Sequence, residues 1–313
     1  MKQYEKAAYT VINKCLSLKS SESILILADD PCIDTAKSLY EICTKRTKNA
    51  IFLQLPVRRH KLIKPVGALM QAVDCAVLLT ATSLSHSVER RLASKKGTRI
   101  ISMPNINMQT FCLLASMNFD KIARLSQKVS DILSMAHEVK ITSANGSELN
   151  FTISKGKGFA DTGIVRESGE FTNLPAGEAS VCPDAGSCNG KLYVDCGMGI
   201  YGKETLKLII KDGRAVRITG SEAARRLRPR LSKYGPNSRM VAEFGIGTND
   251  VTERSGHVLL DEKLKGTVHV AIGNNVSFGG NNDVAIHMDA VIYTPNVVID
   301  GRHILMDGRL LIE

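Results

Sequence analysis

Residues 268–292 have the sequence VHVAIGNNVSFGGNNDVAIHMDAVI, which places two of the chain's seven histidines and an aspartate around a loop of glycine and asparagine. On both sides of this loop, apolar residues alternate with other residues, as is typical of β-strands whose successive side chains point to opposite faces. We expect His287 and Asp289 to project from one face of their strand, roughly 7 Å apart, while the alternate residues pack into a core. His269 should project in the same way from the preceding strand.

Two further acidic residues occur in similar surroundings. In MVAEFGIG (240–247), Glu243 alternates with the apolar Phe244 and Ile246, and the adjacent glycine leaves room for a ligand. Glu178 begins an apolar run after a bend at Pro175 and Gly177, although a solvated glutamate at a turn would look the same in isolation. Burying such groups without partners costs several kcal/mol each.

A divalent metal would compensate for that cost. Neutral imidazole and carboxylate oxygen suit Zn²⁺, Mn²⁺, Co²⁺ or Fe²⁺. Each histidine alone could be a structural residue, and an H-x-D pattern alone is weak evidence. The prediction of a metal site therefore depends on three such strands following one another closely in the sequence.

The composition narrows the class of protein. The chain has 313 residues and is 43% hydrophobic, and this length predicts about two domains. Its net charge is +10. We expect no membrane span and no signal peptide. The eight cysteines form no CxxC pair, as in reduced cytoplasmic proteins. The basic residues are spread out and no recognition motif accompanies them, so we do not expect nucleic-acid binding.

The chain divides into two styles of sequence. In residues 1–138, helical segments alternate with four short apolar strands, which predicts an α/β domain with a parallel, Rossmann-like sheet. It lacks both a GxGxxG motif and a phosphate-binding loop. Residues 139–313 contain the turn dipeptides Asn-Gly and Asp-Gly between alternating strands, which predicts a β-rich α+β metal-binding domain made of hairpins. Its one clear helix is the basic segment 222–233.

Four motifs, NLPAGEASVCP, AEFGIGTN, DEKLKGTVHVAIG and IHMDAVI, occur in an order that resembles the M29-type metal-dependent aminopeptidases, the aminopeptidase T group. The resemblance covers nearly the whole chain. It implies that Glu178, Glu243, His269, His287 and Asp289 bind a pair of divalent metals, and that Glu262 is a general acid or base. The implied activity is hydrolysis of short peptides or related amides by metal-activated water.

Two departures indicate an alternative. The peptidases have a tyrosine seven residues after the first of these histidines, where this chain has Val276, and the chain is also shorter. Both features are similar to 2,5-dihydroxypyridine dioxygenase, a branch in which two histidines and one carboxylate hold a single Fe²⁺ that opens an aromatic ring with O₂. His269, His287 and Asp289 would supply that triad.

Several expectations remain open at this stage. His86, in TSLSHSVERR, is a candidate acid or base, although it could equally be a neighbour of a helix cap. The substrate is expected to be small and polar, and the resemblance implies a homo-oligomer. A third hypothesis is a metal-binding protein without catalytic activity. The helix 222–233 could face solvent, join subunits or attract an anionic substrate.

Overall fold

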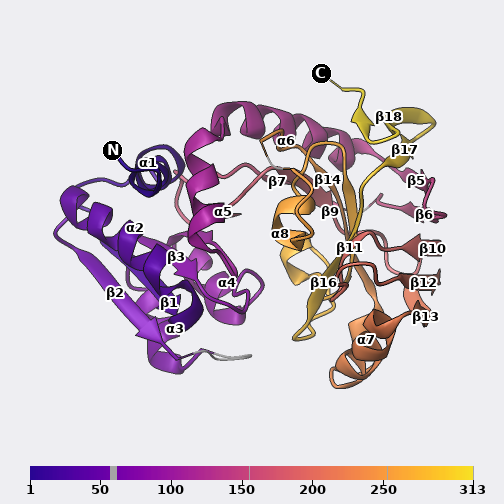
Figure 1. The fold of residues 1–313 in the computed structure, drawn as a ribbon, viewed down its shortest axis with the longest axis horizontal. Coiled ribbons are helices and arrows are strands. Elements are labelled where there is room, and N and C mark those ends of the chain that lie inside the picture. Colours follow the sequence, from indigo (N-terminus) through magenta and orange to yellow (C-terminus); the bar gives the residue numbers. More distant parts are fainter. Residues whose placement is uncertain (57–61, 155, 252, 313) are drawn as a thin grey trace. The chain divides into compact units, whose positions relative to one another are not determined.

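The computed structural model describes residues 1–56, 62–154, 156–251 and 253–312. The chain forms two compact units (Figure 1). The first contains Met1–Ala123 and Asp161–Ala176, and the second contains Arg124–Ala160 and Gly177–Glu313. The sequence predicted a single boundary after residue 138. The units instead divide within helix α6 (Phe119–Met135). The later segment 161–176 belongs to the first unit because it adds a strand to the first sheet.

The first unit is built on a five-stranded sheet in the order β2-β1-β3-β4-β8, and every pairing is parallel. The strands are β1 (Ile24–Asp29), β2 (Ala50–Leu55), β3 (Cys75–Leu79), β4 (Arg99–Ser102) and β8 (Phe171–Asn173). The four apolar segments predicted as strands form β1 to β4. β1, β3 and β4 are buried along their whole length, as expected for a parallel sheet covered on both faces.

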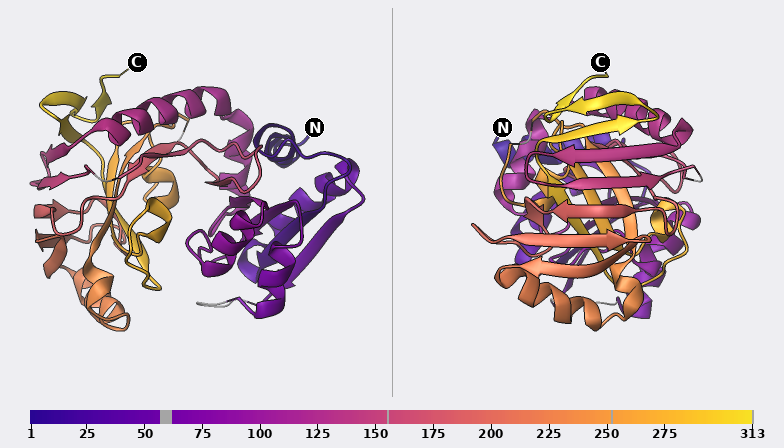
Figure 2. Two further views of the ribbon diagram at one scale, coloured as in Figure 1. Left: turned by 180° about the vertical axis from the view of Figure 1, so that it is seen from behind. Right: turned by 90° about the vertical axis from the view of Figure 1, so that its right-hand side faces the viewer.

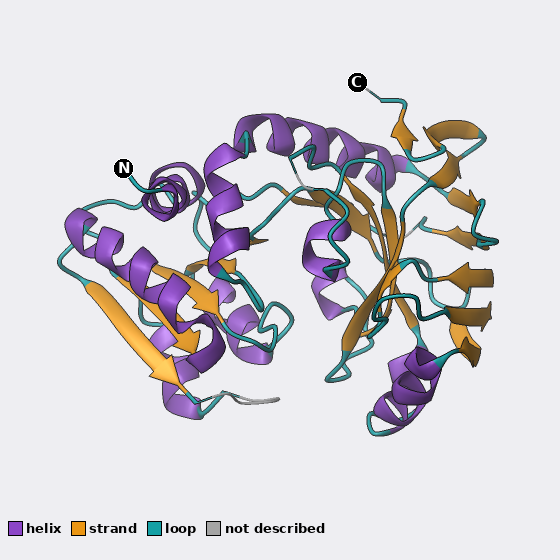
Figure 3. Ribbon diagram, viewed as in Figure 1, coloured by secondary structure: helices purple, strands orange, loops and turns teal. Residues whose placement is uncertain are grey.

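Helices cover this sheet (Figure 3). They are α1 (Gln3–Tyr9), α2 (Ile33–Arg46), α3 (Lys64–Met70), α4 (Val88–Lys95) and α5 (Met108–Leu113). α3 and α4 place Val66, Met70 and Ala93 against the strand residues Leu25 and Leu78. α1, α2 and α5 contact one another, and α2 contacts β1, β2 and β3. The α/β expectation for this part of the chain is therefore matched by the structure.

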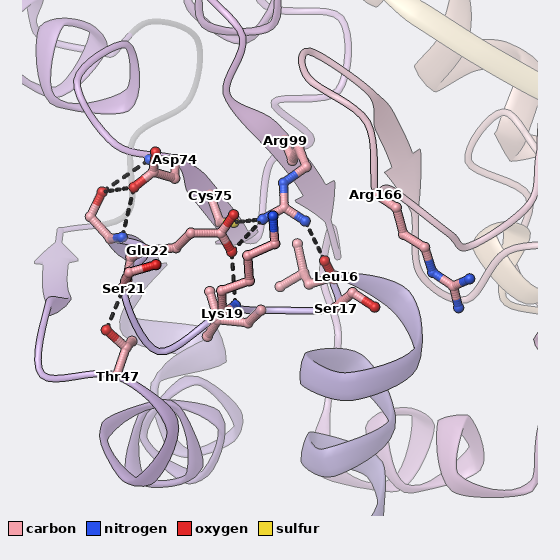
Figure 4. Close-up of polar contacts among 12 residues, drawn as sticks. Leu16, Ser17, Lys19, Ser21, Glu22, Thr47, Asp74, Cys75, Arg99 and Arg166 are labelled. Atoms are coloured by element: carbon pink, nitrogen blue, oxygen red, sulfur yellow. Dashed lines mark hydrogen bonds and ion pairs between the residues drawn. The ribbon is translucent and has the colours of Figure 1, made fainter.

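A buried arginine links three parts of the first unit (Figure 4). Arg99, at the start of β4, is only 6% exposed, and its Nη2 donates to Glu22 Oε2 at 2.7 Å and to Cys75 Sγ at 2.9 Å. Its Nη1 donates to the backbone carbonyl oxygens of Leu16 and Val165. Burying a guanidinium group costs free energy unless its N–H donors are satisfied. These bonds therefore fix β4 to the segment that contains Leu16 and Glu22 and to the segment that contains Val165.

Asp74 joins two neighbouring segments beside this arginine. Its Oδ2 accepts hydrogen bonds from Ser23 N at 2.8 Å and from Ser23 Oγ at 2.7 Å, and these bonds hold the pKa of Asp74 below its ordinary value. A lowered folded-state pKa adds stability above the unfolded pKa, and that stability disappears as the pH falls through the folded value.

We therefore expect Asp74→Asn to lower the free energy of unfolding by about 1 kcal/mol at pH 7, a modest loss because the carboxylate is exposed to solvent. The difference from wild type should shrink as the pH falls below about 4, because the unfolded chain protonates this carboxylate there and the folded protein does so only at lower pH. Urea unfolding at pH 7 and at pH 3.5 measures both values. A difference that stays constant with pH would contradict the assignment.

The second unit contains two antiparallel sheets that stack on each other (Figure 2, right). The larger has the order β13-β12-β10-β6-β5-β17-β18-β19. Its strands are β5 (Glu138–Ser143), β6 (Glu148–Thr152), β10 (Asn189–Tyr193), β12 (Leu206–Lys211), β13 (Arg214–Gly220), β17 (Pro295–Ile299), β18 (Arg302–Met306) and β19 (Arg309–Leu310). The predicted hairpins form at Asn145-Gly146 and at Asp212-Gly213, where Gly146, Asp212 and Gly213 adopt the positive φ angles of tight turns.

The smaller sheet has the order β11-β16-β15-β14-β9-β7 and carries the candidate site. Its strands are β7 (Phe159–Asp161), β9 (Glu178–Val181), β11 (Cys196–Gly197), β14 (Val241–Gly247), β15 (Val268–Gly273) and β16 (His287–Ile292). One large hydrophobic core joins residues of both sheets to α6 and to α7 (Glu222–Ser232), the predicted basic helix. The β-rich α+β expectation is thus matched.

The register of β14 differs from simple alternation. Between Val241 and Glu243 the pairing with β15 shifts, so that Ala242 is an extra residue on β14. Val241 consequently packs in the same core as Phe244 and Ile246, whereas regular alternation would place it on the face of Glu243. Such a bulge reverses the facing of every residue that precedes it.

No helix among the described residues is both long and apolar enough to cross a membrane. All eight cysteines are free thiols, as the absence of a CxxC pair predicted.

Candidate metal centre

Four adjacent strands of the smaller sheet carry the five residues expected to bind metal. Glu178 lies on β9, Glu243 on β14, His269 on β15, and both His287 and Asp289 on β16. The pairing places Ala271 directly opposite Glu243 on one side and Asp289 on the other. The small methyl group of Ala271 therefore leaves space between these two carboxylates.

The five side chains form two groups that share Glu243. In each group the donor atoms of three residues lie within 4.8 Å of one another: Glu178, Glu243 and His269 form one group, and Glu243, His287 and Asp289 form the other. Glu243 Oε1 lies 3.5 Å from His269 Nε2, and Glu243 Oε2 lies 2.9 Å from His287 Nε2. The mononuclear triad expected from the sequence is divided between the groups, with Glu243 between its two imidazoles.

The glycine- and asparagine-rich loop orients His287. The ring Nδ1 of His287 lies 2.7 Å from the carbonyl oxygen of Asn274, which leaves Nε2 directed at Glu243 and at Asp289, 3.2 Å away. Asn274 is itself held by hydrogen bonds from its Nδ2 to Asp283 and Val284. A backbone carbonyl that fixes the far nitrogen is the usual arrangement behind a metal-binding histidine.

Gly245 provides the space for His269. The two residues are direct partners across β14 and β15, and a Cβ atom at Gly245 would lie 2.2 Å from Cε1 and 2.3 Å from Nε2 of the imidazole. Only glycine lets the ring lie across β14 toward Glu178 and Glu243. The sequence had identified this glycine as room for an approaching ligand, and the group that uses the room is His269.

We expect Gly245→Ala to weaken metal binding at least tenfold, because the added methyl group must displace the His269 ring. Overpacking of this kind also costs about 1–3 kcal/mol of stability. Calorimetric titration with Zn²⁺ measures the affinity, and circular dichroism confirms the fold. An unchanged affinity in a folded variant would show that His269 needs no such space.

The charges of the cluster favour a bound cation. Burial disfavours the imidazolium form, yet the carboxylates of Glu178 and Glu243 raise the pKa of His269 to about 9. Asp289 and Glu243 likewise raise the pKa of His287 well above its ordinary value despite burial. Burial also opposes ionisation of Glu243, but hydrogen bonds from both histidines hold its pKa well below its usual range. Without a metal, these carboxylates attract protons to the imidazoles, the positions where a cation would otherwise bind.

The spacing of the donors also fits a metal. Two ligands that each lie about 2.1 Å from a tetrahedral ion are about 3.4 Å apart. His269 Nε2 lies 3.5 Å from both Glu178 Oε2 and Glu243 Oε1, which is long for a hydrogen bond. Nitrogen and carboxylate donors together suit a divalent transition metal. The residues present therefore fit the metal that the sequence predicted.

Glu262, the expected general acid or base, lies next to this cluster. It follows α8 (Val258–Asp261) and is 8% exposed. Burial raises the pKa of Glu262 to about 8, an effect that Asp289 and Glu178 reinforce and that the adjacent Lys263 opposes. At neutral pH the carboxyl group therefore retains a proton that it could donate.

Lys263 is a residue of the site that was not predicted from the sequence. Its side chain is 1% exposed, and its Nζ contacts Glu178 Oε1 and lies 3.1 Å from Glu262 Oε1. A lysine in DEKLKG would ordinarily face solvent. The available signal was the run of Asp261, Glu262 and Lys263 between leucines.

His86 belongs to the first unit, where it immediately precedes the cap of α4. The Ser87 hydroxyl accepts a hydrogen bond from Arg90 N at 3.2 Å, and the His86 carbonyl oxygen accepts one from Arg91 Nη1 at 2.5 Å. The structure thus makes His86 a neighbour of a helix cap, which was one of its two predicted roles. Its role as acid or base stays a prediction.

Comparisons with known proteins give a consistent result. A family model described as NicX, 2,5-dihydroxypyridine 5,6-dioxygenase, matches residues 36–312. The 2,5-dihydroxypyridine 5,6-dioxygenase of Pseudomonas putida KT2440 is 24% identical over 263 residues, which cover 78% of this chain and 73% of that protein.

Two solved structures share the fold. The 2,5-dihydroxypyridine dioxygenase from Pseudomonas putida KT2440 has a TM-score of 0.83 at 18% identity, covering 100% of this chain and 99% of that one. Wild-type AmpT from Thermus thermophilus has a TM-score of 0.69 at 15% identity, covering 99% of each chain. Both superpositions support the mixed α/β fold described above.

Proposed function

Because the chain belongs to the 2,5-dihydroxypyridine 5,6-dioxygenase family, we propose that it is a mononuclear non-haem iron dioxygenase that opens the ring of a small dihydroxylated N-heteroaromatic compound. The observation that carries this proposal is the family match over residues 36–312, a range that includes every residue of the metal cluster. Val276 also favours the dioxygenase over the peptidase, because it stands where the peptidases have a tyrosine and its side chain has no hydroxyl group.

His269, His287 and Asp289 would hold the ion, with the Glu243 carboxylate beside both imidazoles. Two histidines and one carboxylate form the set that holds Fe²⁺ in non-haem oxygenases. When bound, the ion would supply the redox chemistry that activates O₂ toward an electron-rich ring.

Other residues of the chain would position the substrate and move protons. Asp289 is the more open ligand, with 21% of its side chain exposed, so substrate would approach on its side. The ring of Phe278 lies 5.7 Å from the ring of His287, centroid to centroid, and offers an aromatic surface there. Glu262, which holds a proton at neutral pH, would donate it to the oxygen that gains negative charge as the ring opens.

A metal-dependent hydrolase of the aminopeptidase type is the second candidate. The observation in its favour is the pair of donor groups bridged by Glu243, since two metals that share a carboxylate are a common arrangement in hydrolases. The fold of AmpT agrees with this candidate as well. It would use Zn²⁺, Co²⁺ or Mn²⁺ and a short peptide or amide substrate.

One pair of assays separates the candidates. The full chain is loaded with Fe²⁺ and O₂ uptake is followed with 2,5-dihydroxypyridine, while hydrolysis of aminoacyl amides is followed without O₂ after loading with Zn²⁺, Co²⁺ or Mn²⁺. We expect one O₂ consumed per ring opened, with Fe²⁺ alone among these metals. Anaerobic amide hydrolysis without O₂ uptake would overturn the proposal in favour of the hydrolase. Metal binding with neither activity would favour a non-catalytic metal-binding protein.

A further inference from the structure

The buried Lys263 ammonium group lies within the carboxylate cluster of the second unit. Nζ contacts Glu178 Oε1 and is 3.1 Å from Glu262 Oε1, and only 1% of the side chain is exposed. Fully buried lysines are rare unless they are paired, because moving an ammonium group out of water is costly. The group is thus fixed at the site by its carboxylate partners.

The backbone around Lys263 also holds it in place. Asn249 N donates to the Lys263 carbonyl oxygen at 2.8 Å, and Asn249 pairs with Leu264 in a parallel bridge. A Cβ at Gly247, the last residue of β14, would lie 2.1 Å from Leu264 O and 2.9 Å from the Lys263 carbonyl carbon. The segment that carries Lys263 therefore packs directly on β14.

Lys263 contacts Glu178, which belongs to one of the two donor groups. A cation held by Glu178, Glu243 and His269 would need the Glu178 carboxylate, whose Oε1 the ammonium group already contacts. An ammonium group and a divalent ion on one carboxylate would repel each other strongly in a buried site. The ligands of the proposed mononuclear site, His269, His287 and Asp289, include neither Glu178 nor Glu262, the two carboxylates beside the ammonium group.

The sum of charges leads to the same conclusion. The carboxylates of Glu178, Glu243 and Asp289 carry three negative charges, or four when Glu262 is also ionised. Lys263 and one divalent ion supply three positive charges, whereas a second divalent ion would bring the total to five. A buried cluster with excess positive charge and neutral imidazoles would be unfavourable.

We propose that Lys263 takes the place of a second metal ion at Glu178, so that the site binds one divalent cation instead of two. This inference rests on the proposed mononuclear function and names the residue that enforces it. Glu178 is then the partner of Lys263, and the metal is held without it.

Zn²⁺ titration of the full chain tests the proposal, because Zn²⁺ is redox-inert and binds the same nitrogen and oxygen donors. Wild type should saturate at one ion per chain, by calorimetry and by elemental analysis after gel filtration. Lys263→Met removes the charge while keeping the length of the side chain, and this variant should bind two ions. Lys265→Met, two residues away and half-buried, is the matched control and should bind one.

Two ions bound to wild type, or one ion bound to folded Lys263→Met, would overturn the assignment. If Lys263→Met does not fold, the variant Glu178→Gln provides the test. Its Zn²⁺ affinity should stay within about threefold of the wild-type value. A loss of affinity of about 100-fold would identify Glu178 as a metal ligand and overturn the proposal. If the wild-type protein consumes O₂ and binds two ions, the role assigned to Lys263 is wrong but the proposed reaction is not. A one-ion protein that never consumes O₂ defeats the proposed reaction alone.

Discussion

His287→Ala is expected to abolish metal binding, with a loss of affinity of at least about 100-fold, while the protein stays folded. The imidazole Nε2 lies 2.9 Å from Glu243 and 3.2 Å from Asp289, so its removal takes the nitrogen donor from that group. The strand itself should persist, because Met288, Ala290 and Ile292 anchor β16 in the core from the opposite face. The structural cost should be about 1–2 kcal/mol, that of a few lost hydrogen bonds.

Zn²⁺ titration and urea unfolding of the metal-free protein measure the two effects separately. His303→Ala is the control, because His303 is an exposed histidine on β18 of the other sheet of the same unit. If the variant were unfolded but still bound its metal, the prediction would be contradicted and His287 would not be a metal ligand.

Arg99→Met is expected to destabilise the first unit by about 3 kcal/mol, the cost of breaking a buried ion pair from one side. The substitution leaves the Glu22 carboxylate and the Leu16 carbonyl oxygen without the guanidinium donors that they bond in Figure 4. It also removes the bond from Nη1 to the carbonyl of Val165, which lies in the segment that returns to this unit.

Hydrogen exchange of the β1, β3 and β4 amides reports the stability of this unit without requiring the whole chain to unfold at once. Arg166→Met is the matched control. Arg166 is exposed and also bonds a backbone carbonyl, that of Lys14, so its loss should cost less than about 0.5 kcal/mol. Equal exchange rates in the two variants would mean that Arg99 contributes no more than a surface arginine.

Local patterns predicted much of this molecule. Continuous apolar runs identified the four parallel strands β1 to β4. Three of them, β1, β3 and β4, are buried along their whole length and need apolar side chains on both faces. Alternation placed His269, His287 and Asp289 opposite the packed faces of β15 and β16. Asn-Gly and Asp-Gly located two hairpins, since those dipeptides accept the positive φ angles of tight turns.

Other features required contacts between segments distant in the sequence. The bulge at Ala242 moved Val241 into the core, and no local pattern distinguishes such an extra residue from regular alternation. The segment 161–176 belongs to the first unit because β8 forms hydrogen bonds with β4 at the edge of the sheet. The sequence of β8 does not show which strand it pairs with.

The sequence by itself determined the types of secondary structure and the donor residues, because periodicity and residue chemistry are local properties. Tertiary structure alone decided that Glu243 lies between the two imidazoles and that Gly245 makes room for His269. It also decided that Lys263 is buried against Glu178. The physical reason is that strand order and register set which donors meet, and the desolvation of a charge depends on what packs around it.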